Sequence, residues 1–218
     1  MKLNTLTATL GGMLMSSMIT HGAITFVSVA DDLSNISPNS EINTTNSQVD
    51  DFWRQRDGFG EGGITVLEAW NDTEDVAILT MTLTGLAIGE TYDIYTNYIR
   101  FGAGADADGN RGGVRASLNG IDFTTFNGAG GTSGVVGFSE LTGHAASDRV
   151  GLRGYLGTAV ADGSGQIQIF MDDDGLSGGI EERIWLDGAS YGLAAVPEPG
   201  TSALLGIAGL GMILRRRR

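Results

Sequence analysis

Apolar and polar residues alternate along much of the middle of this chain, with the period of two expected for strands that bury one face. In residues 77–84 an apolar side chain occupies every second position, and threonine fills most of the positions between. A similar run at 92–98 follows the turn-forming residues 88–90. We therefore expect residues 77–84 and 92–98 to form two adjacent strands.

Short runs with the composition of strands recur through the rest of the middle region. The chain contains 35 glycines without a collagen-like period, which is typical of many tight turns. Asn119-Gly120 is a hairpin signal, because both residue types tolerate positive φ. The further strands that we expect are residues 24–29, 64–70, 113–119, 121–126, 150–160, 166–171 and 183–192. About nine closely spaced strands and no useful helical period predict an all-β fold, an antiparallel β-sandwich or jelly roll, over residues 24–194.

The beginning of the chain has the layout of a secretory signal peptide. A lysine at the second position precedes a modestly apolar stretch at 3–19, which small residues follow. The stretch is short and rich in threonine, which argues against a spanning helix. Cleavage after Gly22 or Ala23 fits this layout best, and cleavage after Ala30 is the lesser alternative. A buried amphipathic segment is the other interpretation of residues 1–23.

Residues 195–218 combine a proline-rich motif, an apolar run at 201–214 and a basic cluster. The motif is Pro197, Glu198 and Pro199, and the cluster is Arg215, Arg216, Arg217 and Arg218. Fourteen helical residues rise about 21 Å, which is short of the roughly 30 Å hydrocarbon core. Snorkelling arginines and local thinning reduce the difference. We expect a short transmembrane helix with its arginines on the cytoplasmic side of the inner membrane, preceded by a motif that the prolines keep extended.

This tail resembles the PEP-CTERM sorting signal of Gram-negative bacteria, in which a Pro-Glu-Pro motif, a short apolar helix and terminal arginines occur in this order. The resemblance implies processing by an exosortase, a membrane cysteine protease that cuts near Pro197, Glu198 and Pro199. It also implies release or transfer of the protein to the cell surface. Proteins of this kind are associated with exopolysaccharide and the extracellular matrix of biofilms.

The middle region is similar to a group of PEP-CTERM proteins of the verrucomicrobial and planctomycete-like type. The similarity lies in residues 86–95 and in the late run at 163–191, which contains Trp185, Asp187 and Gly188. It implies an exported sandwich of unassigned activity. The expected organisation is thus a signal peptide, a β-sandwich and a sorting signal, at residues 1–23, 24–194 and 195–218.

The charge of the middle region disfavours nucleic acid as a partner. The chain has 13 basic and 26 acidic residues, for a net charge of −13. Five of the basic residues and one acid, Glu198, lie in the two end segments, which leaves 8 arginines, 25 acids and a charge of −17 for residues 24–194. Such a surface repels phosphate backbones, whereas cations or neutral glycans are compatible with it.

The residue inventory excludes several kinds of catalytic and metal site. Without cysteine the chain has no disulfide, thiolate site or cysteine nucleophile, and its two histidines, His21 and His144, cannot build a histidine cluster in the mature domain. His144 has serines nearby, but no nucleophile-elbow motif surrounds them. A carboxylate pair for glycoside hydrolysis cannot be chosen from 25 acids. We therefore expect a protein that is not an enzyme, with a secreted glycan-active enzyme as the last of three hypotheses.

One loop has the beginning of a calcium-binding pattern. Asp106, Asp108 and Asn110 place oxygen side chains at alternate positions of a glycine-rich segment, and calcium takes six to eight oxygens. The EF-hand pattern fails further on, where Arg111 replaces the glycine and Ser117 the bidentate glutamate. A solvated acidic turn is the alternative here and for the acids at 172–174. We expect no cofactor, with calcium as the one exception that this loop would allow.

Aromatic residues raise the possibility of a sugar-stacking platform. Trp53, Trp70 and Trp185, with Tyr95 and Tyr98, would offer ring faces to the apolar side of pyranoses, although core packing is the favoured interpretation. The leading hypothesis is a non-catalytic exported protein of the cell surface or exopolysaccharide-associated matrix, anchored in the inner membrane before processing. The second hypothesis is a cell-surface carbohydrate-binding module that calcium could assist.

Overall fold

The computed structural model of the 218-residue chain describes residues 23–29, 32–45, 47, 51–58, 65–69, 76–101, 114–126, 135–138, 149–173 and 184–194. They belong to one compact unit, Gly22–Ala194. The remainder of the expected signal peptide and the whole expected sorting tail lie outside the described residues.

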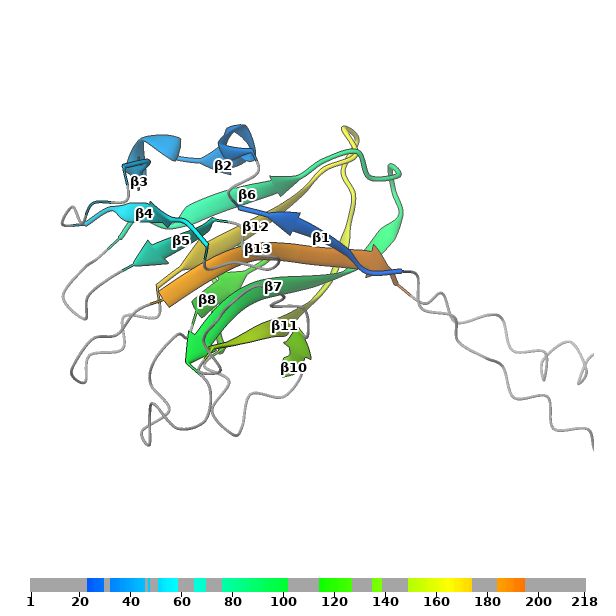
Figure 1. The fold of residues 1–218 in the computed structure, drawn as a ribbon. Coiled ribbons are helices and arrows are strands. Elements are labelled where there is room, and N and C mark those ends of the chain that lie inside the picture. Colours follow the sequence, from blue (N-terminus) through cyan, green and yellow to red (C-terminus); the bar gives the residue numbers. More distant parts are fainter. Residues whose placement is uncertain are drawn as a thin grey trace, which may run out of the picture. The chain divides into compact units, whose positions relative to one another are not determined.

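The compact unit consists of two β-sheets that share one hydrophobic core, so the predicted all-β sandwich is confirmed (Figure 1). The larger sheet has eight strands in the order β10-β11-β7-β13-β5-β4-β3, with β1 added beside β13. Its strands are β1 (Thr25–Ser28), β3 (Ile42–Asn43), β4 (Trp53–Arg56), β5 (Val66–Ala69), β7 (Thr91–Phe101), β10 (Val135–Phe138), β11 (Arg149–Val160) and β13 (Ile184–Leu193). All neighbours are antiparallel except β3 and β4.

The smaller sheet has five antiparallel strands in the order β2-β6-β12-β8-β9. They are β2 (Ile36–Ser37), β6 (Leu79–Leu83), β8 (Val114–Ser117), β9 (Thr124–Phe126) and β12 (Ile167–Asp172). Two single turns of 3₁₀ helix, η1 (Leu33–Asn35) and η2 (Asn39–Glu41), lie on either side of β2. Asp32 begins η1 as its N-cap and accepts a hydrogen bond from the Ser34 backbone N–H at 2.9 Å.

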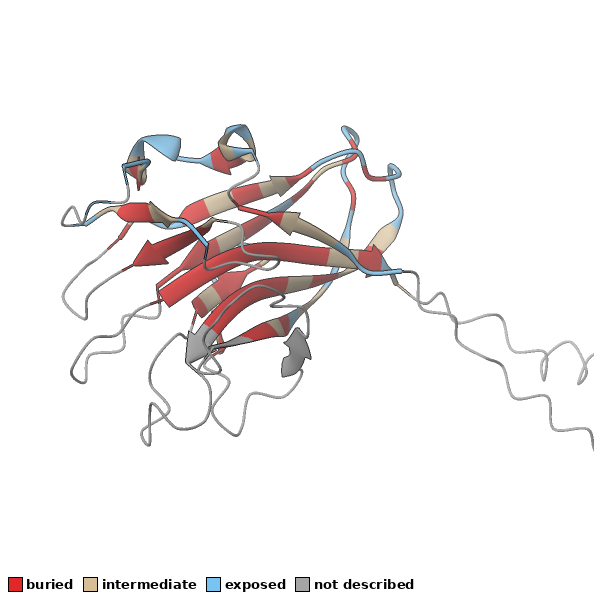
Figure 2. Ribbon diagram, viewed as in Figure 1, coloured by how far each residue is buried: buried red, intermediate tan, exposed pale blue. Residues whose placement is uncertain are grey.

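The alternation of apolar and polar residues along each strand produces the core. In β6, Leu79, Met81 and Leu83 are buried while the threonines between them are half-buried. The facing positions of β7 in the larger sheet include Ile94 and Tyr98, which belong to the same core cluster. Figure 2 shows buried residues along the central strands of both sheets and exposed ones at the connections. This pattern is the expected outcome for two sheets packed face to face.

The prediction that 77–84 and 92–98 form adjacent strands of one sheet is wrong. They become β6 and β7, which lie in different sheets. Their connection crosses between the sheets and is tied to the β11–β12 connection by hydrogen bonds from Leu86 N to the Gly165 oxygen and from Gly89 N to the Ala161 oxygen, each 3.0 Å. Gly85 and Gly89 take positive φ there, which allows the chain to turn without pairing as a hairpin. Both runs bury their apolar faces, but from opposite sides of the core.

Each of the nine predicted segments contains a strand of the structure, and the hairpin at Asn119-Gly120 is also confirmed. Gly120 has φ +70°, whereas the Asn119 side-chain oxygen accepts from the backbone N–H groups of Ile121 and Asp122. Asparagine therefore acts through its side chain and not through positive φ. The strands β2, β3, β4 and β10 were not predicted; β2 and β3 have only two residues each, which is too few to show a period.

Strand β13 lies in the middle of the larger sheet and contacts three strands. Along one edge it pairs with β7, and along the other it pairs first with β5, through Ile184 to Leu186, and then with β1, through Gly188 to Tyr191. The register shifts at the bulge between Leu186 and Gly188, where the chain changes partner. Gly188 has φ +153°, and a Cβ atom there would lie 2.1 Å from the Val27 carbonyl oxygen.

We expect Gly188→Ala to lower the free energy of unfolding by about 2–4 kcal/mol, because it adds backbone strain and a clash with β1. Chemical denaturation of the purified protein measures this change. The matched control is Gly163→Ala in the β11–β12 connection, where a new Cβ has no neighbour within 4 Å and the effect should stay within about 0.5 kcal/mol. Equal stability of the two variants would contradict the role assigned to the bulge.

Candidate functional site

Two of the three tryptophans predicted as a stacking platform are buried. The exposed fraction is 0% for Trp53 and 1% for Trp185, and the Trp53 indole N–H donates to the Ala77 carbonyl at 2.8 Å. Neither ring offers a free face to a sugar, so the sugar-stacking prediction is wrong for these two residues. Core packing, the other interpretation, applies to them. Trp70 lies outside the described residues.

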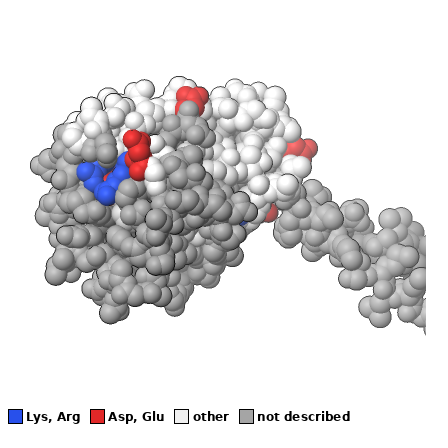
Figure 3. Space-filling view, viewed as in Figure 1, with Lys and Arg blue, Asp and Glu red and all other residues white. Residues whose placement is uncertain are grey.

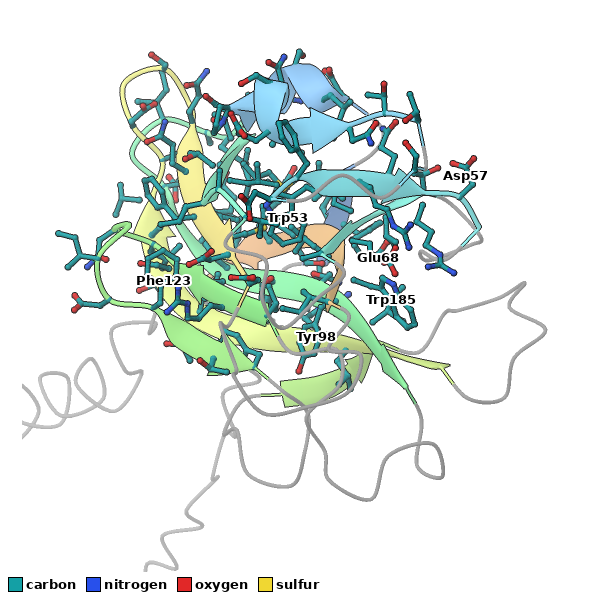
Figure 4. All side chains as sticks on the ribbon, turned by 90° about the vertical axis from the view of Figure 1, so that its left-hand side faces the viewer. Trp53, Asp57, Glu68, Tyr98, Phe123 and Trp185 are labelled. Carbon is teal, nitrogen blue, oxygen red and sulfur yellow. The ribbon has the colours of Figure 1, made fainter. Side chains whose placement is uncertain are left out.

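Trp185 instead belongs to a buried polar cluster on the side of the larger sheet that faces away from the main core. Its indole N–H donates to Glu68 Oε1 at 2.8 Å, and Arg56 Nη1 lies 2.8 Å from the same oxygen. Arg54 Nε donates to Glu68 Oε2. Figure 4 shows Glu68 and Trp185 next to each other, with Asp57 on the far side of Glu68. Val66 and Ile99 pack with Trp185 into a small second apolar cluster.

Glu68 acts as a structural charge in this arrangement. Its carboxylate is fully buried and receives donors from two arginines and one indole, so both oxygens are occupied. A buried carboxylate is stable only when such partners replace water. At the surface, the face seen in Figure 3 shows basic side chains beside an acidic one, and most of the other described surface there is uncharged. Glu68 is therefore not available as a general base or a metal ligand.

The proposed calcium ligands, Asp106, Asp108 and Asn110, lie outside the described residues, as does His144. Asp172 and Asp173, the first two of the acids at 172–174, are described and are 3% and 6% exposed. Asp172 accepts from Arg115 of the neighbouring strand, so a solvated turn is the wrong interpretation for these two acids. Within the described part of the chain, no three histidine or acidic side chains are grouped as a metal site would require.

The larger sheet also carries a partly exposed pair of tyrosines, Tyr95 and Tyr155. They are cross-strand partners on β7 and β11, and their ring centroids are 5.3 Å apart with planes inclined by 54°. The Tyr155 hydroxyl donates to Asp93 Oδ1 at 3.0 Å. Arg153 lies over the Tyr95 ring, with its guanidinium carbon 5.8 Å from the centroid. We call Asp93, Tyr95, Arg153 and Tyr155 the tyrosine patch.

The electrostatics of the tyrosine patch favour neutral phenols. Burial, with the nearby Asp93 carboxylate, raises the pKa of Tyr95 above its ordinary value of 10.0, while Arg153 opposes the rise. Burial and the hydrogen bond to Asp93 raise the pKa of Tyr155 in the same direction. The patch therefore combines aromatic surface, a hydroxyl, a carboxylate and a guanidinium. These groups can contact the C–H face and hydroxyls of a sugar.

Sequence analysis identified one member of this patch, Tyr95, and missed the others. The alternation of side chains along the strand at 92–98 places Asp93 and Tyr95 on the same face of the sheet. This local pattern was enough to predict that the two residues are neighbours. Tyr155 and Arg153 lie about sixty residues further along the chain, and only the pairing of β7 with β11 brings them beside Tyr95. No local pattern specifies that register.

The sorting residues Pro197, Glu198 and Pro199 and the arginines at 215–218 lie outside the described residues. In the described segments, no helix is long and apolar enough to cross a bilayer. The profile of the PEP-CTERM protein-sorting motif matches residues 195–218. No curated protein and no solved structure matches the chain significantly. The chain thus carries the sorting signal of exported proteins that an exosortase processes.

The raised pKa values lead to a prediction for high pH. Since the folded protein keeps Tyr95 and Tyr155 neutral when unfolded tyrosines ionise, their contribution to stability is complete below about pH 10 and is lost as pH rises through the raised values. We expect Asp93→Asn to lower both pKa values toward 10 and to flatten this loss. NMR titration of ring-labelled tyrosine measures the pKa values, and unchanged values in the variant would contradict the contribution assigned to Asp93.

Proposed function

We propose that this protein is a non-catalytic component of the cell surface or of the extracellular, exopolysaccharide-associated matrix. The observation that carries the proposal is the sorting motif at residues 195–218, placed directly after the sandwich. An exosortase would recognise this tail and cut it near Pro197, Glu198 and Pro199. The sandwich would then be the part that remains at its destination.

Before processing, the apolar run at 201–214 would anchor the chain in the inner membrane. Arg215 to Arg218 would hold its end on the cytoplasmic side and leave the sandwich outside. The signal peptide at 1–23 would start export. Membership of the verrucomicrobial and planctomycete-like type, based on residues 86–95 and 163–191, belongs to the same proposal.

Two buried acids in the described part of the sandwich have structural partners. The buried acids Glu68 and Asp172 are bonded to arginines and so stabilise the sheets. A general acid or base needs a carboxyl group that is free to exchange a proton with substrate. Neither of these two carboxylates is in that situation.

Replacing Pro197, Glu198 and Pro199 together by alanine should leave the uncut precursor in the membrane fraction, because the protease loses its motif while the apolar anchor stays. Pulse-chase labelling followed by cell fractionation measures this result. Changing Arg215–Arg218 to glutamate should also prevent correct anchoring, whereas the matched change to lysine keeps the charge and should be tolerated. Normal release of the alanine variant would refute exosortase processing at this motif.

A second candidate function is that of a carbohydrate-binding module, and the tyrosine patch is the observation that favours it. Tyr155 is 38% exposed and lies beside the half-buried Tyr95. Asp93 accepts a hydrogen bond from the Tyr155 hydroxyl, and the Arg153 guanidinium lies over one face of the Tyr95 ring. Tyrosine is suited to such surfaces because it buries much area with little loss of conformational freedom. The tyrosine patch thus takes the place of the buried tryptophans as the stacking surface.

If the module binds sugars, Tyr95→Ala and Tyr155→Ala should each weaken glycan binding about tenfold, the usual loss when a central aromatic contact is removed. A glycan array followed by calorimetry, with and without calcium, measures the affinity and tests the proposed Asp106, Asp108 and Asn110 loop. Ile121→Ala, an 80% exposed residue of the β8–β9 turn, is the matched control. Binding that the tyrosine variants leave unchanged would remove this second function.

A further inference from the structure

One end of the sandwich collects strand ends from across the chain. β13 ends and β1 begins there, with Thr25 opposite Tyr191, as Figure 1 shows at its right-hand side. β7 begins beside them, and the Ala194 N–H donates to the Thr91 oxygen at 3.0 Å. The β6–β7 and β11–β12 connections complete this end. This hydrogen bond fixes the last described residue, Ala194, to the edge of the larger sheet.

Four aliphatic side chains at this end are exposed. The exposed fractions are 44% for Ile24, 67% for Ile88, 59% for Val160 and 48% for Leu193. Val160 lies opposite Thr91, on the outer face of the larger sheet, whereas Leu193 lies opposite the core residue Tyr92, so the two side chains are on opposite faces at this end. We call Ile24, Ile88, Val160 and Leu193 the exit surface. Ile88 is held near Val160 by the hydrogen bond from Gly89 N to the Ala161 oxygen. Aliphatic side chains exposed on both faces of one end can be contacted together by a partner that covers that end.

The covalent chain determines what must approach the exit surface. Only two residues separate Ala194 from Pro197, so their Cα atoms are at most about 11 Å apart. A protease that cuts at residues 197–199 must bring its active site within that reach of Ala194. It therefore faces the exit surface whenever the sandwich is folded.

The other processing junction lies at the same end. The expected signal-peptide cut follows Gly22 or Ala23, immediately before β1. Because Thr25 lies opposite Tyr191 in an antiparallel pair, Ala23 comes out of the sheet beside Leu193. Both expected membrane-directed signals are therefore joined to one end of the sandwich.

We propose that the exit surface is a docking site for the membrane-embedded protease that cuts the tail, so that cleavage depends on the folded sandwich as well as on the motif. This inference rests on the proposed function. The occupant is a protein surface and not the lipid surface, because the exposed acids Glu90 and Asp162 lie at the same end and would be repelled by anionic headgroups. The four aliphatic side chains would instead fill apolar sites on the protease, and the surrounding acids would meet polar or basic groups.

The test compares cleavage rates of full-length variants in the producing bacterium by pulse-chase labelling. Ile88→Ser combined with Val160→Ser should slow cleavage about tenfold, the order expected when two central apolar contacts are lost. The matched control is Ile78→Ser, which removes a 43% exposed isoleucine just before β6, at the opposite end of the sandwich. Inserting about 20 glycine and serine residues between Ala194 and Pro197 should slow cleavage similarly, because a chain spanning roughly 25 Å uncouples the sandwich from the protease.

Four results decide how the rates are interpreted. Circular-dichroism melting of each purified full-length variant must match the wild type, so that slower cleavage reflects the surface. Cleavage of the double variant at the wild-type rate would overturn the docking site while leaving exosortase processing intact. Binding of the purified protein to phosphatidylethanolamine–phosphatidylglycerol vesicles, lost in the double variant, would assign the surface to lipid and also overturn the proposal. Absence of cleavage in the wild type would instead refute the proposed function, and with it this inference.

A crosslinking experiment gives a second, independent readout. The chain has no cysteine, so Ile88→Cys and Ile78→Cys each introduce a single thiol for a photoreactive label. In inner-membrane vesicles that contain the protease, the label at position 88 should crosslink to it, and the label at position 78 should not. Equal crosslinking at both positions, or none at position 88, would contradict docking through this end.

Discussion

The backbone hydrogen bonds of β13 are the interaction on which the rest of the structure depends. This strand pairs with β7 along one edge and with β5 and then β1 along the other, so it joins the two halves of the larger sheet. The change of partner occurs at the bulge before Gly188, where β1 approaches too closely for any side chain. Because β13 is also the last strand among the described residues, the larger sheet is completed only once residues up to 193 are available for pairing.

The sorting motif follows β13 directly in the chain. A cut near residues 197–199 leaves β13 and its hydrogen bonds whole, since the sheet ends at Ala194. The larger sheet is further stabilised by Glu68, whose buried carboxylate links β5 to β4 through two arginines and to β13 through Trp185. These buried charges explain how a strongly acidic chain uses some of its few arginines: they neutralise acids inside the fold.

Burial separates the aromatic residues into two groups with different uses. Trp53 and Trp185 are enclosed and donate their indole N–H groups to a carbonyl and a carboxylate. Tyr95 and Tyr155 lie side by side with part of their surface exposed. Residue type alone suggested the larger rings for sugar contact, but the larger rings are also those whose burial stabilises a sheet most. The exposed pair was recognisable only once β7 and β11 were aligned.

The sequence by itself determined the nine main strands, the sandwich class, the Asn119-Gly120 hairpin and the sorting motif, because each follows from residues close together in the chain. Period-two alternation and turn chemistry are local, and so is a tail of proline motif, apolar run and arginines. Only the tertiary structure decided that β6 and β7 lie in different sheets, that Glu68 and Trp185 are buried partners, and that Tyr155 meets Tyr95. These facts depend on strand pairing between residues tens to more than a hundred positions apart, and many registers bury the same apolar faces, so local pattern cannot select among them.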